Sequence, residues 1–317
     1  MKKTILFLAV AAICGAANAT ILRVSNVTNS GAPYSEISQA ISAAEEGDTI
    51  MVDGSNTSYG NITLTKRVVM IGPGYLLNDN GKVNEGSPSA QIGTVSSNYN
   101  AANGSILMGL DITGLITFSQ PNMVITRCRI ANDIQIVASA TNCIVHQNYF
   151  TDGGVSSSNP TNTFAYGTQI TNNIISSPHT DRVGRIKAIS DGYIAYNTFT
   201  RGGIGDVPRN IGNVTGCTIE HNYFVEVSKS ISGNVVQDNL WTENYGATVY
   251  ADCSTDKAVL EMYNSKENHQ GFGAFAGDDP YVVSGIPAGP YISDITVPAS
   301  VEQGQILRVN VKLGVQQ

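Results

Sequence analysis

Four stretches decide the fold: IVHQNYF at residues 144–150, QITNNII at 169–175, YIAYNTF at 193–199 and TIEHNYF at 218–224. Each contains an asparagine with an apolar residue three positions before it and another two positions after it. The same spacing surrounds three further residues, so the pattern has seven steps. Its anchor positions are Leu110, Cys128, Asn148, Asn173, Asn197, Asn222 and Asn239. Such a repeat predicts a β-solenoid in which each step is about one coil.

The apolar residues of the pattern form two columns. Three positions before the anchors stand Leu107, Ile125, Val145, Ile170, Ile194, Ile219 and Val236. Two positions after them stand Ile112, Ile130, Phe150, Ile175, Phe199, Phe224 and Trp241. Successive anchors are 18, 20, 25, 24, 25 and 17 residues apart, so the coils share a core but differ in loop length. Both columns are interpreted as core, since aromatic stacking along the solenoid explains them without a ligand.

The anchor asparagines are interpreted as structural residues. Asparagine tolerates left-handed backbone geometry, which suits a tight bend between strands. Its side-chain amide can also bond to the same position of the neighbouring coil. The pattern therefore predicts a ladder of amides at the bends and gives these residues no catalytic role.

Residues 1–19 read as an export signal. Two lysines at positions 2 and 3 precede an apolar run at 5–13, and Ala17 and Ala19 fit the rule for signal peptidase cleavage. The run is too short to span a bilayer. A lipid anchor on Cys14 is the alternative, but the bulky Ile13 before it disfavours that signal. We expect a soluble chain of bacterial type without a membrane span, secreted, on the cell surface or in the periplasm.

The mature chain is acidic. Removing the two lysines of the signal from 18 basic residues leaves 16 against 25 acidic residues, a net charge of −9. Nucleic-acid binding depends on neutralising phosphates with basic residues, so this balance predicts no nucleic-acid partner. The length suits one large domain, because a solenoid grows by adding coils.

The cysteines do not predict disulfides. Cys143 and Cys217 both stand five positions before an anchor, three coils apart. At about 4.8 Å per coil they are about 14 Å from each other, which is beyond disulfide reach. Cys128 occupies an anchor position. Together with Cys253, these residues are expected to be buried free thiols that pack as small apolar groups.

The N-terminal part carries a resemblance to a known family. Ile37, Ala40, Ile41 and Ala44 have helical spacing and predict a short amphipathic helix, placed to cap the first coil. GDTI at 47–50, YGNI at 59–62 and VMIGPG at 69–74 follow it. With these motifs, roughly residues 20 to 263 resemble right-handed parallel β-helix proteins of the pectate-lyase-like superfamily. The resemblance implies the fold far more specifically than a function.

Three regions are expected: a cleaved signal at 1–19, a parallel β-helix at 20–263 and a C-terminal closing segment at 264–317. Residues 78–104 read as a long loop with one poor strand around 92–95, after which regular coils resume at Ser105. The closing segment resembles that of secreted bacterial β-helix surface proteins. It predicts strands at 292–297 and 306–311 and a β cap over the last coil. The stub of a sandwich-like module is the alternative.

Long insertions in three successive coils, at 151–166, 176–190 and 200–215, predict one wall of a cleft. Basic residues gather there, with a histidine and three acidic residues among them. The set is His179, Asp181, Arg182, Arg185, Lys187, Asp191, Arg201, Asp206 and Arg209. A uronic-acid glycan suits such a group, because arginine pairs bidentately with carboxylates. The alternative is a set of solvated loop charges that form surface ion pairs.

The resemblance also implies that the protein could be an enzyme. Uronate lyases on this fold use a lysine or arginine base and calcium held by acidic side chains. Arg185, Lys187 and Arg209 are the candidates for the base, and Asp181, Asp191 and Asp206 are the candidates for calcium. Neither a dense acidic cluster nor the Arg-x-Pro-x-x-Arg pattern of pectate lyases occurs, so no cofactor is expected unless the protein is a lyase. Fragments of polygalacturonase motifs, including GDD at 277–279, are treated as chance matches.

Together these features predict a secreted or cell-surface β-helix, a monomer, that binds extracellular polysaccharide along the loop wall. Two alternatives stay open. One is a polysaccharide lyase or glycoside hydrolase that acts on an acidic glycan. The other is a structural or adhesin-like protein whose rigidity is its function.

Overall fold

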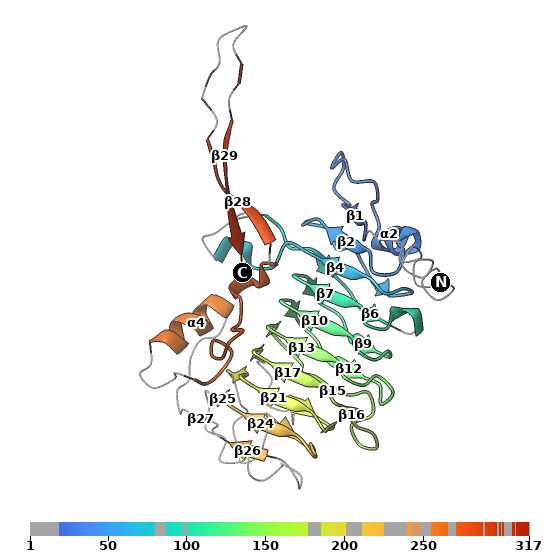
Figure 1. Cartoon of the computed structure of the whole chain (residues 1–317), viewed down its shortest axis with the longest axis vertical. Helices are drawn as coiled ribbons and strands as arrows, with labels where there is room; N and C mark the ends of the chain where they lie inside the picture. Colours follow the sequence, from blue (N-terminus) through green and yellow to red (C-terminus); the bar gives the residue numbers. More distant parts are fainter. Residues whose placement is uncertain are drawn as a thin grey trace, which may run out of the picture.

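The computed structural model of the chain describes residues 19–79, 87–97, 100–176, 185–200, 211–224, 240–242, 245–246, 255–265, 271–287, 289–296, 298, 300, 306–307 and 309–316. Three long sheets dominate it, and every pair of neighbouring strands within them is parallel. In each regular coil the chain passes through sheets A, C and B in that order. The stacked strands are visible from β1 to β26 in Figure 1. The predicted all-β parallel β-helix is confirmed.

The sheets differ in length. Sheet A has ten strands: β1 (Ile21–Val24), β2 (Thr49–Val52), β4 (Val69–Ile71), β7 (Ile106–Met108), β10 (Val124–Thr126), β13 (Ile144–His146), β17 (Gln169–Thr171), β21 (Tyr193–Ala195), β24 (Thr218–Glu220) and β26 (Leu240–Thr242). Sheet C has eight: β5 (Gln91–Ile92), β8 (Asp111–Ile112), β11 (Arg129–Ile130), β14 (Tyr149–Phe150), β18 (Ile174–Ile175), β22 (Thr198–Phe199), β25 (Tyr223–Phe224) and β27 (Tyr245–Gly246). Sheet B has seven: β3 (Ile62–Thr63), β6 (Val95–Ser96), β9 (Ile116–Phe118), β12 (Ile134–Ile136), β15 (Val155–Ser157), β19 (Ile186–Lys187) and β23 (Ile211–Gly212). A short fourth sheet pairs β16 (Ala165–Tyr166) with β20 (Ile189–Ser190).

The pairing register confirms both apolar columns for the first six steps. Leu107, Ile125 and Val145 are in register in sheet A, and the column continues through three further coils. Ile112 and Ile130 begin the matching column in sheet C. The inward side chains described for these columns are buried, because each faces the same position of the coils above and below.

The seventh step was predicted in the wrong register. Ile219 pairs with Trp241, so Trp241 stands in the column of sheet A, where Val236 was expected. The error is five residues, the distance between the two columns. In this register Gly246 pairs with Phe224 in sheet C, and a glycine at an apolar position hid the true step from the sequence pattern. Val236 and Asn239 lie outside the described residues.

The bends between sheets A and C contain a row of left-handed residues, one position before each anchor. Their φ angles are 65° at Gly109, 53° at Arg127, 55° at Gln147, 54° at Asn172, 55° at Tyr196 and 55° at His221. Left-handed geometry was expected at the anchor asparagines themselves, which was wrong by one residue. A left-handed residue turns the chain from one sheet into the next.

The anchor asparagines form the predicted ladder of amides. Asn173 Oδ1 accepts hydrogen bonds from the backbone nitrogen and Nδ2 of Asn148, at 2.9 and 3.0 Å. Asn173 Nδ2 donates to Val145 O at 2.8 Å and to Asn197 Oδ1 at 3.0 Å. The same pattern joins Asn197 to Asn222. Each amide therefore satisfies backbone groups that the bend leaves without a strand partner.

The predicted N-terminal helix is α2 (Ile37–Ala43), and Figure 1 shows it at the N-terminal end of the solenoid beside β1 and β2. Ile37, Ala40 and Ile41 are buried in the main core. Lys66 Nζ donates to the carbonyls of Ser42 and Ala44, at 2.7 and 2.6 Å, and so satisfies acceptors at the helix C-terminus. The helix covers apolar surface that the first coils expose, as expected of a cap.

Two strands occupy the region before Ser105 where a long loop with one poor strand was expected. The stretch at 78–104 contains β5 and β6 on either side of Gly93 and Thr94, in two different sheets. With β4 these strands complete a coil before Ser105. Two-residue strands carry too little apolar periodicity to be separated from a loop in one sequence, which explains the difference.

The C-terminal part runs along the flank of the solenoid. After α4 (Asp256–Asn264), residues 271–287, here called the flank strap, pass over the bends between sheets A and C (Figure 1). Gly273 N donates to His221 O, Asn172 Nδ2 to Ala276 O, and Arg127 Nη1 to Ile286 O, so the strap runs back toward the first coils. A cover over the last coil was expected from this segment, and the described contacts of 271–287 lie along the side instead. The predicted boundary after residue 263 falls at the end of α4.

The strap ends in an antiparallel pair, β28 (Gly289–Thr296) and β29 (Asn310–Gln316). Figure 1 shows the pair extending away from the solenoid. Both strands were predicted, at 292–297 and 306–311, and the second begins four residues later than expected.

A buried polar network joins the strap to the first coils and to α4. Tyr281 OH donates to Asp256 Oδ2 at 2.9 Å, so the hydroxyl of Tyr75, which also contacts Tyr281 OH, acts as the donor in that second bond. The backbone nitrogen of Ser284 donates to the same carboxylate oxygen. Burial raises the pKa of Tyr75 and of Tyr281, which keeps both hydroxyls protonated as donors.

The three free thiols among the described cysteines, Cys128, Cys143 and Cys217, are buried as expected. Burial raises the pKa of Cys128 to about 12 and that of Cys143 to about 11, so neither is a thiolate at neutral pH. Their role is packing. Cys253 lies outside the described residues.

The amide ladder yields a stability prediction. Asn173→Ala removes four hydrogen bonds and takes a partner from the buried backbone nitrogen of Asn148 and from the carbonyl of Val145. At about 1–3 kcal/mol for each unsatisfied buried group, we expect the free energy of unfolding to fall by about 2–4 kcal/mol. Urea unfolding measures this. Asn162 is exposed, and its replacement by alanine is the control, with an expected change below about 0.5 kcal/mol. Equal changes in both variants would contradict a structural role for the ladder.

The network of Tyr75, Tyr281 and Asp256 yields a second stability prediction. Tyr281→Phe keeps the ring and removes the hydroxyl between Tyr75 and Asp256. We expect a loss of about 2–4 kcal/mol, because a buried hydroxyl and a buried carboxylate each lose a partner. Tyr166→Phe is the control, since Tyr166 is exposed on β16. If both variants unfold at the same urea concentration as the wild type, the network does not hold the strap.

Candidate functional site

The basic segments predicted from sequence begin and end at stacked strands. The predicted insertion at 176–190 starts after β18 and contains β19 and β20, and the insertion at 200–215 starts after β22 and contains β23. β18 pairs with β22 in sheet C, and β19 pairs with β23 in sheet B. The strands before and within the two insertions are therefore one coil apart, at a spacing of about 4.8 Å. His179, Asp181, Arg182, Arg201, Asp206 and Arg209 lie outside the described residues.

Arg185 and Lys187 are described, and they differ in exposure. The Arg185 residue is 4% exposed, and its carbonyl accepts a hydrogen bond of 2.7 Å from Val155 N. Lys187 is partly exposed on β19, in register with Ser156 and Gly212 of the neighbouring coils. Of the two, Lys187 is the one placed to reach a ligand at the surface.

Asp191 is the acidic candidate whose position the structure describes. It follows β20, at the turn into sheet A, with a φ of 54° and an exposed side chain. Ser190 Oγ donates to its Oδ2 at 3.0 Å. Asp181 and Asp206, by contrast, belong to the segments between sheets C and B. Within the described ranges, no three His, Cys, Asp or Glu residues gather closely enough to hold a metal ion.

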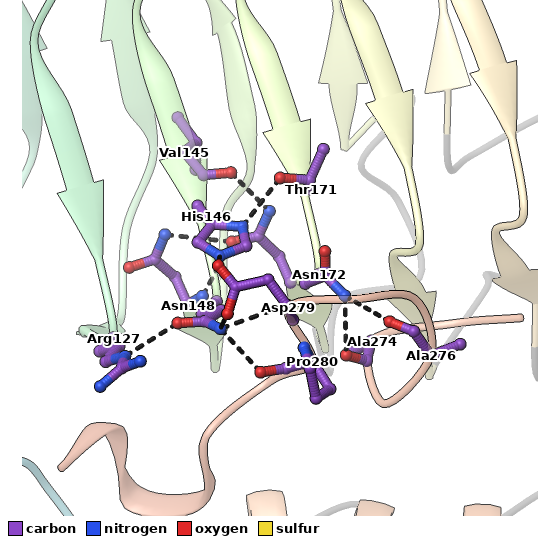
Figure 2. Close-up of polar contacts among 12 residues, drawn as sticks. Arg127, Val145, His146, Asn148, Thr171, Asn172, Ala274, Ala276, Asp279 and Pro280 are labelled. Carbon is purple, nitrogen blue, oxygen red and sulfur yellow. Dashed lines mark hydrogen bonds and ion pairs between the residues drawn. The ribbon is translucent and has the colours of Figure 1, made fainter. Parts of the chain in front are cut away.

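The bends beside the strap contain a polar cluster that the sequence analysis did not find. His146 Nε2 is 3.0 Å from Asp279 Oδ2, and His146 Nδ1 is 2.8 Å from Thr171 Oγ1. Gln147 Nε2 donates to Asp279 Oδ1 at 2.7 Å and to Pro280 O at 2.7 Å. Figure 2 shows His146, Thr171 and Asp279 close together, beside Pro280 of the strap.

A buried arginine supports the cluster from one side. Arg127 Nε donates to Gln147 Oε1 at 2.8 Å, which fixes the amide so that its nitrogen faces the strap. Arg127 Nη1 donates to Ile286 O at 3.2 Å. The residues therefore form a continuous hydrogen-bonded row from Arg127 through Gln147, Asp279 and His146 to Thr171.

The charge state of His146 follows from its surroundings. Burial lowers the pKa of His146 below 6.5, and the neighbouring carboxylate of Asp279 opposes that shift. The imidazole is therefore neutral at neutral pH. A carboxylate can only accept, so Nε2 carries the hydrogen and Nδ1 accepts from the Thr171 hydroxyl.

Further along the bends the same row of left-handed residues binds the strap. Asn172 Nδ2 donates to Ala274 O and Ala276 O, at 3.1 and 2.9 Å. The rings of Tyr196 and His221 stack with centroids 4.9 Å apart, and Phe272 of the strap packs 5.7 Å from His221. The position before each anchor is thus a docking column for the strap.

The residue types in this column, taken together with their backbone geometry, indicate that their side chains make contacts. Arg127, Gln147, Asn172, Tyr196 and His221 are all large polar or aromatic residues at positions with positive φ, where glycine is the residue without strain. Such residues at a strained position indicate that their side chains make contacts. The partner on the strap could not be found in this way, because Asp279 is more than 130 residues from His146 in the chain.

The chain has a weak structural likeness to a known protein. No protein-family model and no curated protein matches the chain. A solved structure of a pectin methylesterase mutant in complex with a hexasaccharide aligns with 84% of this chain and 98% of that chain, at 12% sequence identity and a TM-score of 0.23. A likeness this weak carries no argument about function. Among the residues described, no helix is both long and apolar enough to cross a membrane.

The His146 cluster predicts a pH dependence. Because the folded state lowers the pKa of His146, the unfolded chain takes up the proton first. The stability that this residue contributes is present above about pH 6.5 and is lost as the pH falls through the folded-state value. We expect the Tm of the wild type to fall more than that of His146→Gln between about pH 7.5 and about pH 5. Calorimetry at both values measures this, and parallel losses would show that His146 is not the titrating group.

Proposed function

We propose that this protein is a secreted or cell-surface β-helix of the pectate-lyase-like type that binds extracellular acidic polysaccharide as a monomer. The ligand lies along the edge between sheets C and B and contacts the basic segments at 176–190 and 200–215. Arg182, Lys187, Arg201 and Arg209 supply the positive charge, and His179 lies in the same stretch.

One observation carries this proposal. The strands on both sides of the two basic segments are stacked in register, β18 on β22 and β19 on β23. Residues contributed at one position of successive coils form a row, and a row suits a ligand that itself repeats. The positive charge stands out because the whole chain has 18 basic and 25 acidic residues.

The charge type of the ligand follows from the basic side chains. Arginine binds a carboxylate through two parallel hydrogen bonds, and lysine adds a point charge. A uronate presents one carboxylate on every sugar unit. Neutral glucans offer no such group, so the proposal separates acidic from neutral polysaccharides.

The main test is a combined variant, with Arg182, Lys187, Arg201 and Arg209 replaced by alanine. Arg185 is left in place because its burial would turn the experiment into a test of folding. If the four charges contribute about 0.5–1 kcal/mol each, affinity falls about 30- to 1,000-fold. Affinity electrophoresis through gels that contain polyuronate or neutral glucan measures the change.

The controls separate this site from general charge effects. Lys257→Ala removes one exposed positive charge on α4, and Lys187→Ala removes one on β19. We expect Lys187→Ala, but not Lys257→Ala, to weaken retention by polyuronate. Added salt should also weaken retention of the wild type. Equal retention of the wild type and the combined variant would defeat the site. Equal retention by acidic and neutral gels would defeat the proposed ligand.

A further inference from the structure

Three side chains from distant parts of the sequence form a row of hydroxyl, imidazole and carboxylate beside the strap. Thr171 Oγ1 is 2.8 Å from His146 Nδ1, and His146 Nε2 is 3.0 Å from Asp279 Oδ2. His146 and Thr171 are in register on neighbouring strands β13 and β17, and both are partly exposed. Figure 2 shows the imidazole between the other two groups.

The hydrogen positions in this row are determined by its chemistry. Asp279 accepts from Nε2–H, so Nδ1 presents a lone pair to the Thr171 hydroxyl. The hydroxyl hydrogen then points at a base that a carboxylate orients from its far side. A nucleophile within hydrogen-bond reach of a base, with that base held by a third group, is the arrangement of hydroxyl-based covalent catalysis.

The carboxylate is itself held in place. Gln147 Nε2 donates to Asp279 Oδ1 at 2.7 Å, and Arg127 Nε fixes the Gln147 amide at 2.8 Å. Asp279 is 72% exposed at its side chain, so these bonds and the imidazole are what restrict its orientation. A fixed carboxylate keeps the imidazole in one tautomer.

Attachment of the strap does not account for this row. Gln147 Nε2 bonds to the carbonyls of Asp279 and Pro280, and Asn172 Nδ2 bonds to those of Ala274 and Ala276. These bonds hold the strap backbone on both sides of the His146 position. The Asp279 side chain and the imidazole add a polarised hydroxyl that the attachment does not use.

We propose that Thr171, His146 and Asp279 form a hydrolytic site for acyl esters, with Thr171 as the nucleophile. Thr171 Oγ1 attacks the ester carbonyl carbon while its proton passes to His146 Nδ1. The carbon–oxygen bond to the alcohol breaks, and the leaving oxygen takes that proton and departs as the free alcohol. Water then attacks the acyl-threonine, gives a proton to Nδ1, and releases the carboxylic acid, with the proton returning to Thr171 Oγ1. This activity is independent of glycan binding at the opposite edge of sheet C.

The test uses the whole chain and p-nitrophenyl acetate, an activated acetyl ester. We expect release of p-nitrophenol, and peptide mass spectrometry of acid-quenched samples should locate an acetyl group on Thr171. Thr171→Val keeps the shape of the side chain and should reduce the rate to that of the buffer. Thr171→Ser keeps a hydroxyl and should keep activity. Loss of base catalysis in His146→Gln should lower the rate about 100-fold or more.

Thr126→Val is the matched control. Thr126 belongs to the same column, in register with His146 on its other side, so the change alters the same face of sheet A. We expect wild-type rates from this variant. Asp279→Asn should lose activity while its strap stays attached, which thermal unfolding of the same sample checks. No hydrolysis and no adduct in the wild type, equal rates in the wild type and Thr171→Val, or an acetyl group on another residue would overturn the proposal.

Discussion

The amide ladder at the bends is the interaction on which the rest of the structure depends. A parallel β-helix satisfies its backbone groups between coils along the strands, but each bend leaves some of them without a strand partner. Asn148, Asn173 and Asn197 supply those partners from their side chains, and each also bonds to the next asparagine. Because a buried polar group without a partner costs about 1–3 kcal/mol, the ladder fixes the coil register at the bends.

That ladder also determines where the C-terminal segment attaches. A left-handed residue precedes each described anchor, and Arg127, Gln147, Asn172 and His221 contact the strap from these positions. Gln147 and Asn172 bind strap carbonyls, and Tyr196 and His221 pack their rings. The strap therefore contacts the same position of successive coils on the outer side of the solenoid. Its far end reaches Tyr75, which joins the first coils to α4 through Asp256.

The two proposed sites depend on different features of the fold. The proposed glycan site depends on the stacking of coils, because the strands beside the basic segments are in register, β18 on β22 and β19 on β23. The ester hydrolase site depends on a contact across the fold, because Asp279 comes from the strap and His146 and Thr171 come from sheet A. The first proposed site depends on the repeat of the coils, and the second depends on the position of the strap beside sheet A.

Local spacing of residues was sufficient to predict the solenoid, its two apolar columns, the asparagine ladder and the N-terminal helix. It misplaced the last step, where glycine stands in an apolar column at Gly246, and it assigned the left-handed position to the anchors instead of their neighbours. The course of the strap and the contact between Asp279 and His146 could be recognised only in the folded chain. Those contacts join residues far apart in the chain without any periodic pattern, so no local spacing encodes them. Their partners meet only after the coils have stacked.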